Sequence, residues 1–247
     1  HFHPDSYGYR PGKSALDAVG ITRQRCWRQD WVIDLDIKGF FDNVSHEWML
    51  KFLRVRIVDP SFLLLIRRFL KAGYMDSGIL VHTERGTPQG GNLSPTLSNI
   101  FLHYVLDIWA SWWRKTKAKG DMIIVRYADD FVIGFQYYEE AETFLAALQR
   151  RLTEYELTLH PKKTRLIEFG RFATGNRKRK GKGKPETFDF LGFTHICSKN
   201  RKGYFFLRRK TKRNRLKRKL GEVKLELKKR MHEKVNEKGK WVTKVIS

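Results

Sequence analysis

Two apolar runs, residues 122–126 and 131–135, flank four residues that read YADD in one-letter code. Strand-like runs on either side of a short polar segment predict a β-hairpin, with Asp129 and Asp130 at its tip. Asp is common in turns because its side chain hydrogen-bonds to nearby main chain, so this pair alone would indicate only a turn. Adjacent carboxylates also repel each other, and a bound cation relieves that repulsion. The hairpin therefore predicts either a turn or one part of a cation site.

Further carboxylates lie on a second β-rich stretch, residues 31–42. Asp34 and Asp36 are two residues apart, so they face the same side of a strand. Charges on so apolar a strand cost free energy unless they are paired or bind metal. Carboxylate oxygens suit Mg²⁺, and two such ions can clamp the attacking and leaving oxygens of an in-line phosphoryl transfer. The residues themselves predict metal-assisted phosphoryl or nucleotidyl transfer, with Asp34 in a structural or supporting role.

Six sequence blocks in a fixed order extend this prediction over most of the chain. Together they resemble the group II intron-encoded (bacterial retroelement) reverse transcriptases. A YADD box alone is a weak signal, whereas the ordered set is specific. The blocks are residues 6–12 (SYGYRPG), Asp36 followed by Phe41, residues 86–95 (GTPQGGNLSP), residues 127–130 (YADD), residues 157–164 (LTLHPKKT) and residues 188–193 (FDFLGF).

The resemblance implies template-directed DNA synthesis, in which a primer 3′-hydroxyl attacks the α-phosphate of a deoxynucleoside triphosphate. It implies two Mg²⁺ ions bound by Asp36, Asp129 and the Ile37 carbonyl, with Asp130 as a weaker ligand. Lys163 takes the position of a proton donor near the departing pyrophosphate. The implied partners are an RNA template with a DNA or RNA primer, dNTPs, and intron RNA as a further candidate.

The resemblance also implies contacts to the nucleotide and to the duplex. A Phe41 ring beneath the sugar would clash with a ribose 2′-hydroxyl and so select dNTPs. Without the surrounding motif, Phe41 would be predicted to lie in the core. The implied nucleotide contacts are Arg10, Phe41, Gln89 and Gly90. The implied primer grip is Phe190, Leu191 and Gly192, and the implied contacts to the nucleic-acid backbone are Arg209, Lys212, Arg213, Arg215 and Lys219.

Positive charge is concentrated in the last third of the chain, which carries a net charge of +24 in total. Residues 171–247 hold 27 Lys and Arg against 6 Asp and Glu, a net charge of +21, which leaves +3 for residues 1–170. This distribution indicates a polyanionic partner, nucleic acid before membrane. No apolar run approaches about 18 residues, so we expect no membrane span. Cys26 and Cys197 predict neither a zinc site nor a disulfide framework, which fits a bacterial-type cytoplasmic protein associated with nucleic acid.

The order of strand-like and helical segments predicts an α+β fold, because hairpins and helices do not alternate as simple βαβ units. We expect a polymerase right-hand palm, with an antiparallel four-stranded sheet and helices behind it, partial fingers and the start of a helical thumb. The expected domains are residues 1–30 (partial fingers), 31–49 (palm, first catalytic strand), 50–90 (fingers insertion), 91–204 (palm with catalytic hairpin and primer grip) and 205–247 (thumb with a basic helix).

Periodicity and capping residues predict the helices within this fold. They begin near Lys13 or Ser14, at Ser45 and at Ser94, and they extend over residues 60–74, 141–155 and 211–238. Gly73 suits a C-terminal cap for the helix over residues 60–74. Apolar stripes at helical spacing are expected to face the core: Phe62, Leu65, Ile66, Phe69 and Leu70; Leu97, Phe101, Tyr104, Val105, Ile108 and Trp112; Phe144, Leu145, Leu148 and Leu152; and, in the simplest interpretation of the last helix, Leu216, Leu220, Val223, Leu227, Met231 and Val235. Residues 188–193 and 203–207 are expected to form a second hairpin, which resembles the primer grip. Residues 171–187 are so basic and so poor in apolar side chains that we expect a mobile loop.

Two other classes of function stay open on the sequence. One is an RNA-binding splicing maturase module, in which the polymerase body is a scaffold; three retained carboxylates count against an inactive site. The other is an RNA-dependent RNA polymerase or a nucleotide cyclase; Phe41 counts against ribonucleotides, and Gln89 with the basic thumb counts against a cyclase. The chain opens at His1 without Met, so we expect a fragment or a trimmed chain. Nothing in the sequence indicates an oligomeric state.

Overall fold

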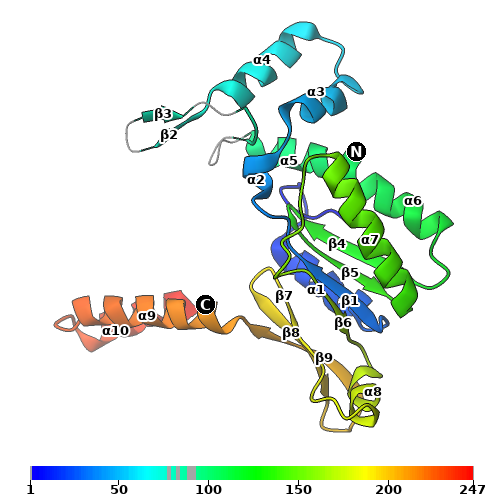
Figure 1. The fold of residues 1–247 in the computed structure, drawn as a ribbon. Helices are drawn as coiled ribbons and strands as arrows, with labels where there is room; N and C mark the ends of the chain where they lie inside the picture. Colours follow the sequence, from blue (N-terminus) through cyan, green and yellow to red (C-terminus); the bar gives the residue numbers. More distant parts are fainter. Residues whose placement is uncertain (1, 77–78, 82–83, 88–92, 247) are drawn as a thin grey trace.

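A four-stranded antiparallel sheet forms the centre of the molecule, with strands in the order β4-β5-β1-β6 (Figure 1). These strands are β1 (Trp31–Leu35), β4 (Met122–Tyr127), β5 (Asp130–Phe135) and β6 (Arg165–Glu168). Residues 2–76, 79–81, 84–87 and 93–246 are described in this computed structural model. The sheet confirms the predicted α+β fold and the antiparallel pairing.

Both faces of the sheet are covered, which explains why its central strands β5 and β1 are apolar over most of their length. Val125 and Val132 point to one face, where they share a core with residues of α1 (Ala15–Cys26). Ile124 and Ile133 point to the other face and share a core with residues of α5 (Ser94–Leu102) and α7 (Tyr138–Glu154). Alternate residues of one strand therefore belong to two separate cores.

Two helices begin where their capping residues predict. Ser14 and Asp17 form a reciprocal capping box at the start of α1, in which each side chain bonds to the main-chain N–H of the other. Asp59 caps α4 (Pro60–Lys71) by accepting from the N–H of Ser61 at 2.8 Å. The helix ends at Lys71, three residues before the predicted end at residue 74, and Gly73 follows it with a φ of 74°, as suits a residue just past a helix C-terminus.

Two other predicted caps do not act as caps. Ser45 precedes α3 (His46–Arg54), but its hydroxyl donates to Glu156 at 3.0 Å instead of accepting from the helix. The cap of α5 is Leu93 and not Ser94, because Leu93 already has helical dihedral angles and Ser94 is the first helical residue. The position of α5 is nonetheless within one residue of the prediction.

The helical segment after α5 departs from a simple periodicity. A π-helical turn over His103–Asp107 separates α5 from α6 (Ile108–Thr116). A π turn contains more residues than an α turn, so it rotates the following side chains around the axis. Ile108 and Trp112, predicted to be core residues, are 47% and 48% exposed, whereas Trp113 is 5% exposed and packs inward. The prediction for Leu97, Phe101 and Val105, which precede or lie within the turn, is confirmed.

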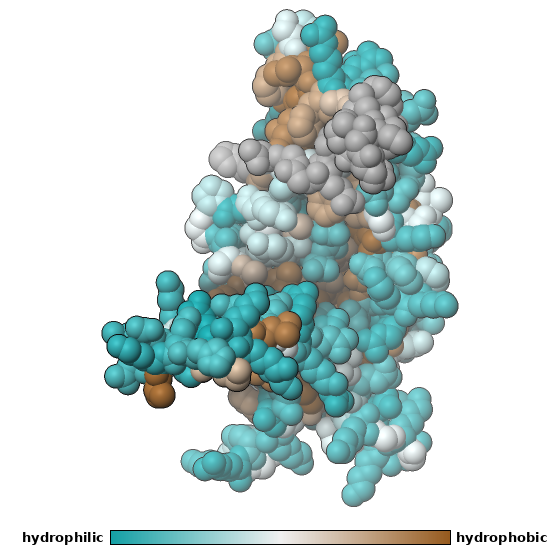
Figure 2. All heavy atoms as spheres, turned by 90° about the vertical axis from the view of Figure 1, so that its left-hand side faces the viewer, coloured by the Kyte–Doolittle hydropathy of each residue, from teal (hydrophilic) through white to brown (hydrophobic). Residues whose placement is uncertain are grey.

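A smaller unit extends from the sheet at the top of Figure 1. It contains α2 (Phe40–Asn43), α3, α4 and the hairpin of β2 (Tyr74–Asp76) and β3 (Ile79–Val81). The apolar stripe predicted on α4 lies only partly in the core. Ile66 is buried as predicted, whereas Phe62 and Leu65 are 47% and 61% exposed. Figure 2 shows apolar side chains gathered at this tip of the molecule.

A three-stranded sheet follows the central one along the chain, where a two-stranded hairpin was predicted. It consists of β7 (Phe188–Phe190), β8 (Phe193–Lys199) and β9 (Phe205–Thr211). Before it, the predicted loop over residues 171–187 contains a short helix, α8 (Ala173–Arg179). Arg177 folds this segment back on itself by donating to the carbonyl of Gly183 and pairing with Glu186. The prediction of a loop was therefore wrong over residues 173–179.

The basic C-terminal segment forms two helices where one was predicted, α9 (Arg213–Lys229) and α10 (Val235–Ile246). Arg230 bonds to both Glu226 and Glu233, and the chain reverses here so that its guanidinium lies 5.3 Å from the Trp241 ring centroid. No residue of α9 is buried, so its apolar stripe is not the core that was predicted. Figure 2 shows a mostly hydrophilic surface over this projection. No helix among the described residues is long and apolar enough to cross a membrane.

Candidate active site

The YADD residues form a tight hairpin turn at one end of the central sheet. Tyr127 pairs with Asp130 across β4 and β5, which leaves Ala128 and Asp129 as the two turn residues. Ala128 has a φ of 54°, a left-handed conformation that non-glycine residues seldom adopt. Strained backbone of this kind persists only where the surrounding structure stabilises it, and it is frequent at functional sites. The predicted hairpin is confirmed, with a turn shorter than the four-residue segment that the sequence suggested.

Asp36 reaches the same end of the sheet from a different strand. Leu35 pairs with Phe131 between β1 and β5. Continued by one residue, this antiparallel register sets Asp36 opposite Asp130. The carboxylates of two distant sequence blocks are thereby brought together, as predicted.

The pKa values of these carboxyl groups reflect how closely their charges are gathered. Partial burial raises the pKa of Asp130, and the charges of Asp129 and Asp36 raise it further, to about 6. Burial also raises the pKa of Asp129, and the charge of Asp36 adds to this effect. Gathering three partly buried or exposed carboxylates at one place favours protonation or a bound cation, because their charges repel one another.

Lys163 supplies one cation to the site. Its ammonium lies 2.7 Å from Oδ2 of Asp36, and the hydrogen bond and charge of that carboxylate raise the pKa of Lys163. The preceding loop is fixed to the end of β1, because the N–H of His160 donates to the Asp36 carbonyl and that of Lys38 donates to the Thr158 carbonyl. This bridge leaves the carbonyl of Ile37 pointing away from the loop.

The donor set suits a hard divalent cation. Carboxylate and main-chain oxygens are the ligands that Mg²⁺ prefers. The charge of Asp36 contributes to the raised pKa values of both Asp129 and Asp130, and the charge of Asp129 contributes to that of Asp130. No group of three His, Cys, Asp or Glu side chains within the described ranges is arranged closely enough to hold a metal ion. Asp36 instead accepts a hydrogen bond from Lys163. To bind a metal ion through the same oxygen, the Asp36 carboxylate would have to release the Lys163 ammonium.

Asp34 lies outside this trio although it is only two residues before Asp36 in the sequence. Its Oδ2 accepts from Arg165 at 2.5 Å, and Arg165 also donates to the carbonyl of Thr187. Burial raises the pKa of Asp34, and the Arg165 guanidinium opposes that effect. The geometry agrees with a structural carboxylate that ties β1 to β6.

Arg126 stabilises the strained turn by a hydrogen bond to its main chain, a role that was not predicted from the sequence. Its side chain is fully buried and donates to both carboxylate oxygens of Asp107, at 2.7 and 2.6 Å. It also donates to Oδ1 of Asn99 and to the carbonyl of Ala128, both at 2.9 Å. Burial raises the pKa of Asp107, but the guanidinium outweighs this effect and holds the pKa below its ordinary value. The buried Arg126–Asp107 ion pair is therefore hydrogen-bonded to the main chain of Ala128, the residue before Asp129.

The N-terminal loop closes around the same turn. Asn99 donates to the Gly8 carbonyl at 2.8 Å, and the N–H of Tyr7 donates to the Arg126 carbonyl at 2.8 Å. A Cβ added at Gly8 would lie 2.4 Å from the main-chain nitrogen of Ala128. Only glycine therefore fits at position 8, and the SYGYRPG block packs directly against the YADD block.

A signal for Arg126 was present in the sequence. The apolar run over residues 122–126 ends in a cation, and a buried cation needs a partner, by the argument already applied to Asp34 and Asp36. The partner could not be identified, because Asp107 belongs to the π-helical turn that simple periodicity does not predict.

Only some of the predicted nucleotide-binding residues lie close to one another among the described residues. Arg10 donates to the carbonyls of His3 and Ser6, both at 2.7 Å, and so stabilises the N-terminal loop. Phe41 lies on α2, half-buried, with its ring 5.3 Å from that of Phe40. The Phe41 carbonyl accepts from the N–H of Thr87, which brings the start of the GTPQGG block beside it. Gln89 and Gly90 lie outside the described residues.

The β7–β8 turn faces the aspartates from the second sheet. Phe190 pairs with Phe193, so Leu191 and Gly192 form a two-residue turn with φ values of 49° and 82°. The main-chain N–H of Lys212 donates to the Gly192 carbonyl at 2.9 Å. The positive charge of Lys212 also lowers the pKa of Asp130 against the larger effects that raise it. The candidate primer grip therefore lies within electrostatic range of Asp130.

The remaining basic candidates lie at the junction of β9 and α9. Lys212 pairs with Asp189 at 3.0 Å, and Arg215 packs on the Gly192 turn. Lys219 pairs weakly with Glu222 at 3.9 Å. Arg209 and Arg213 are exposed. The structure thus sets a row of cations along a segment that leads away from the aspartates.

Comparison with known proteins agrees with this geometry. Protein YkfC of Escherichia coli (strain K12) is 35% identical over 162 residues, which are 53% of this chain and 42% of that protein. The group II intron-encoded protein LtrA of Lactococcus lactis subsp. cremoris is 40% identical over 102 residues, which are 41% of this chain and 17% of LtrA. The chain thus spans less than half the length of these relatives.

Solved structures share the fold at low sequence identity. Telomerase from Candida albicans, solved in complex with a TWJ fragment of telomeric RNA, has a TM-score of 0.54 and 16% identity over 81% of this chain and 36% of its own. This likeness shows the right-hand polymerase fold alone. The sequence pattern of the family described as reverse transcriptase (RNA-dependent DNA polymerase) matches residues 1–195. The chain belongs to the reverse transcriptase family.

Proposed function

We propose that this chain is the polymerase part of an RNA-directed DNA polymerase that adds dNTPs to a primer by two-metal nucleotidyl transfer. One observation carries the proposal: Asp36 and the pair Asp129 and Asp130 come from two separate sequence blocks and meet at one end of the sheet, where partial burial and the charges of Asp129 and Asp36 raise the pKa of Asp130 to about 6. Such an accumulation of negative charge is stable when divalent cations bind there. The family likeness supports the nature of the reaction.

Reverse transcriptases use divalent metal ions, and we assign two Mg²⁺ ions to this site. Asp36, Asp129 and the Ile37 carbonyl would hold them, with Asp130 as the weaker ligand. When bound, the ions supply positive charge to the attacking oxygen and to the phosphate oxygens. The primer 3′-oxygen forms a bond to the α-phosphorus. The bond between the α-phosphorus and the oxygen that bridges to the β-phosphate breaks, and pyrophosphate leaves. The proton of the 3′-hydroxyl passes to solvent.

Lys163 is assigned the protonation of the departing pyrophosphate. Its ammonium is one hydrogen bond away from Asp36, so it is already present at the site. The raised pKa of Lys163 keeps that nitrogen protonated near neutral pH, as a proton donor requires.

The sugar and the base are assigned to the residues around α2 and the N-terminal loop. Phe41 would lie beneath the deoxyribose and exclude a 2′-hydroxyl. Arg10, Gln89 and Gly90 complete the proposed nucleotide pocket. The primer terminus is assigned to Phe190, Leu191 and Gly192, and the duplex backbone to Arg209, Lys212, Arg213, Arg215 and Lys219.

These roles define the parts of a right hand. We assign residues 1–30 and 50–90 to the fingers, 31–49 and 91–204 to the palm, and 205–247 to the thumb. The proposed partners are an RNA template, a DNA or RNA primer and dNTPs. A cytoplasmic location in association with nucleic acid belongs to the same proposal.

A splicing maturase role is a second candidate. Its support is the net charge of +21 over residues 171–247, together with relatives that include a group II intron-encoded protein and a putative COX1/OXI3 intron 2 protein of Saccharomyces cerevisiae. A thumb so basic suits a large structured RNA as well as a primer–template duplex. The two functions are compatible in one chain.

Primer extension tests the main proposal. A DNA primer annealed to an RNA template is incubated with Mg²⁺ and either dNTPs or rNTPs. We expect the primer to be extended in the incubation with dNTPs and not in the incubation with rNTPs. Extension with rNTPs alone, or on a DNA template only, would contradict the proposal. Splicing of intron RNA by an Asp129→Asn variant tests the second candidate separately, because that role does not need the carboxylate.

A further inference from the structure

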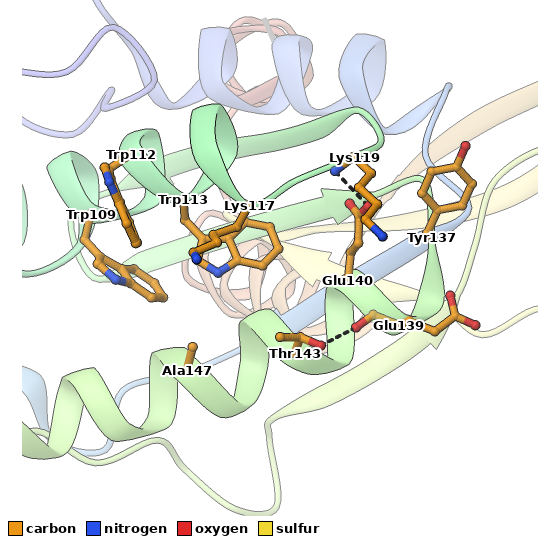
Figure 3. A pocket seen from close by; sticks show the side chains of 10 residues that line it. All are labelled: Trp109, Trp112, Trp113, Lys117, Lys119, Tyr137, Glu139, Glu140, Thr143 and Ala147. Carbon is orange, nitrogen blue, oxygen red and sulfur yellow. Dashed lines mark hydrogen bonds between the residues drawn. The ribbon is translucent and has the colours of Figure 1, made fainter.

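A cavity of about 680 Å³ lies between α6 and α7, on the face of the sheet opposite to α1. Its size is typical of pockets that bind small ligands or parts of larger ones. Figure 3 shows that its upper wall is formed by side chains of α6 and its lower wall by α7. The lining residues are Trp109, Trp112, Trp113, Lys117, Lys119, Tyr137, Glu139, Glu140, Thr143 and Ala147.

The cavity is separate from the aspartate site. Lys119 precedes β4, and Tyr137 follows β5, so both flank the open end of the hairpin whose other end carries Asp129. Each strand has six residues, and a strand rises about 3.4 Å per residue, which sets the two sites about 20 Å apart. A ligand in this cavity therefore does not contact the reacting groups.

Two aromatic rings of the cavity are available for stacking. Trp113 is 5% exposed and packs on Phe135 and Phe144 as part of the core. Trp112 and Tyr137, by contrast, are 48% and 47% exposed. The π-helical turn causes this exposure, since it rotates Trp112 out of the core. Aromatic side chains exposed beside a cavity have free faces for another planar group.

The charges around the rings favour an anion. Lys117 lies 6.0 Å from the Trp112 ring centroid, and neither Lys117 nor Lys119 has an ion-pair partner in the described part of the chain. Glu140 is engaged elsewhere, since its carboxylate accepts from the main-chain N–H groups of Lys119 and Gly120. In Figure 3 the Glu139 carboxylate points away from the tryptophans.

We propose that this cavity binds a short unpaired stretch of a single RNA strand, with one base stacked on Trp112, another stacked on Tyr137, and the phosphates between them contacted by Lys117 and Lys119, which lie between the two rings in Figure 3. Exposed aromatic rings combined with unpaired lysines are the features by which proteins bind single-stranded nucleic acid. A quaternary ammonium ligand would also stack on the rings, but the lysine over Trp112 repels it. The site is additional to the proposed polymerase function and does not rest on the aspartates.

The test is the binding of fluorescein-labelled octauridylate to protein already saturated with an unlabelled primer–template duplex. The duplex occupies the polymerase site, so fluorescence anisotropy then reports a second site. Trp112→Ala should weaken this binding about 5- to 150-fold, the loss of one base–aromatic stack. Trp27→Ala is the matched control, because Trp27 is 41% exposed and lies outside the cavity; it should leave the affinity unchanged.

Salt dependence provides a second readout. The slope of log affinity against log salt should fall by about 1.4 in a Lys117→Ala/Lys119→Ala variant, since each phosphate contact to a single strand contributes about 0.7. Lys71→Ala, an exposed lysine on α4, should not change it. Both cavity variants should extend a short primer at the parental rate.

Three outcomes would overturn the inference. They are the absence of a second binding event on duplex-saturated protein, equal weakening by Trp112→Ala and Trp27→Ala, and binding of uridine monophosphate as tight as that of the strand, which would indicate a free-nucleotide site. An Asp129→Asn protein should still bind the octamer. Loss of extension in that variant with retained octamer binding therefore separates this inference from the proposed polymerase function.

Discussion

The Arg126 guanidinium donates to the carbonyl oxygen of Ala128 at 2.9 Å, two residues further along the chain and immediately before Asp129. The Nε and Nη2 atoms of the same guanidinium donate to the two carboxylate oxygens of Asp107. The conformation of the YADD turn, with φ of 54° at Ala128, is thereby tied to a buried ion pair below the sheet. This contact explains how a strained turn can hold a carboxylate in one position.

Arg126→Met should destabilise the protein by about 3–5 kcal/mol, because it leaves the buried Asp107 without its cation. An Asp107→Leu/Arg126→Met double variant removes both charges and should recover most of the stability, as measured by urea unfolding. Nucleotide incorporation should stay low in the double variant, since the Ala128 carbonyl has no donor in either. Recovery of incorporation together with stability would show that Arg126 has only a structural role.

Phe41→Ala should relax the choice of sugar. Removal of a ring that contacts the 2′ position changes discrimination by about 10- to 200-fold, as expected for a steric contact in a pocket. The measurement is the ratio of kcat/KM for dNTP and rNTP incorporation opposite the same template base. Phe62→Ala, which removes an exposed ring from α4, is the control. If the Phe41→Ala protein discriminates between dNTPs and rNTPs as well as the parent, the proposed selection by Phe41 is wrong. Phe41 would then be a packing residue, which agrees with its partial burial.

Lys163→Gln should slow incorporation and at the same time lower the Mg²⁺ concentration needed for half-maximal rate. The slowing, about 10²- to 10⁴-fold, reflects loss of the proton donor. The shift in Mg²⁺ dependence follows because Asp36 loses the ammonium that now lies 2.7 Å from it. Lys163→Arg retains the cation and should keep the parental Mg²⁺ dependence. A parental rate in the Gln variant would exclude the proposed donor.

The pKa of Asp130 predicts a pH-dependent stability in metal-free protein. Its folded value is about 6, above the ordinary value near 3.9 of an unfolded Asp. The folded state therefore binds the proton more tightly, and the stability gained by protonation is full below pH 4 and lost as the pH rises to about 6. In EDTA at pH 8, Asp130→Asn should be more stable than the parent by about 1 kcal/mol, after a discount for the solvent screening of an exposed group. At pH 4 the two proteins should be equal; a constant difference from pH 4 to pH 8 would contradict the assignment.

Much of the central sheet followed from local patterns. The apolar runs around the YADD residues predicted β4 and β5, and the carboxylates at their ends predicted that Asp36 would meet Asp129. These features depend on residues close in sequence and on one strand pairing. Helix starts near Ser14 and at Pro60 were also predicted, and in the structure Ser14 and Asp59 cap these two helices.

The features that were missed depend on contacts between distant segments. The π-helical turn at His103–Asp107 exists together with the buried pairing of Asp107 with Arg126, and neither residue reveals the other in the sequence. Its rotation of Trp112 to the surface created the cavity between α6 and α7, which periodicity placed in the core. The break between α9 and α10 involves Arg230 and its two glutamates, which a periodic stripe of leucines does not show.

The most direct test of the account is a paired measurement on Asp129→Asn: incorporation of a single dNTP on an RNA template, and affinity for the same primer–template without nucleotide. Asp59→Asn is the matched control, since it also replaces one carboxylate by an amide and Asn caps a helix as well as Asp. We expect incorporation to fall by about 100-fold or more in Asp129→Asn, while its affinity for the duplex and both properties of Asp59→Asn stay at parental values. Parental incorporation by Asp129→Asn, or an equal loss of incorporation and binding, would contradict catalysis by the aspartates at this end of the sheet.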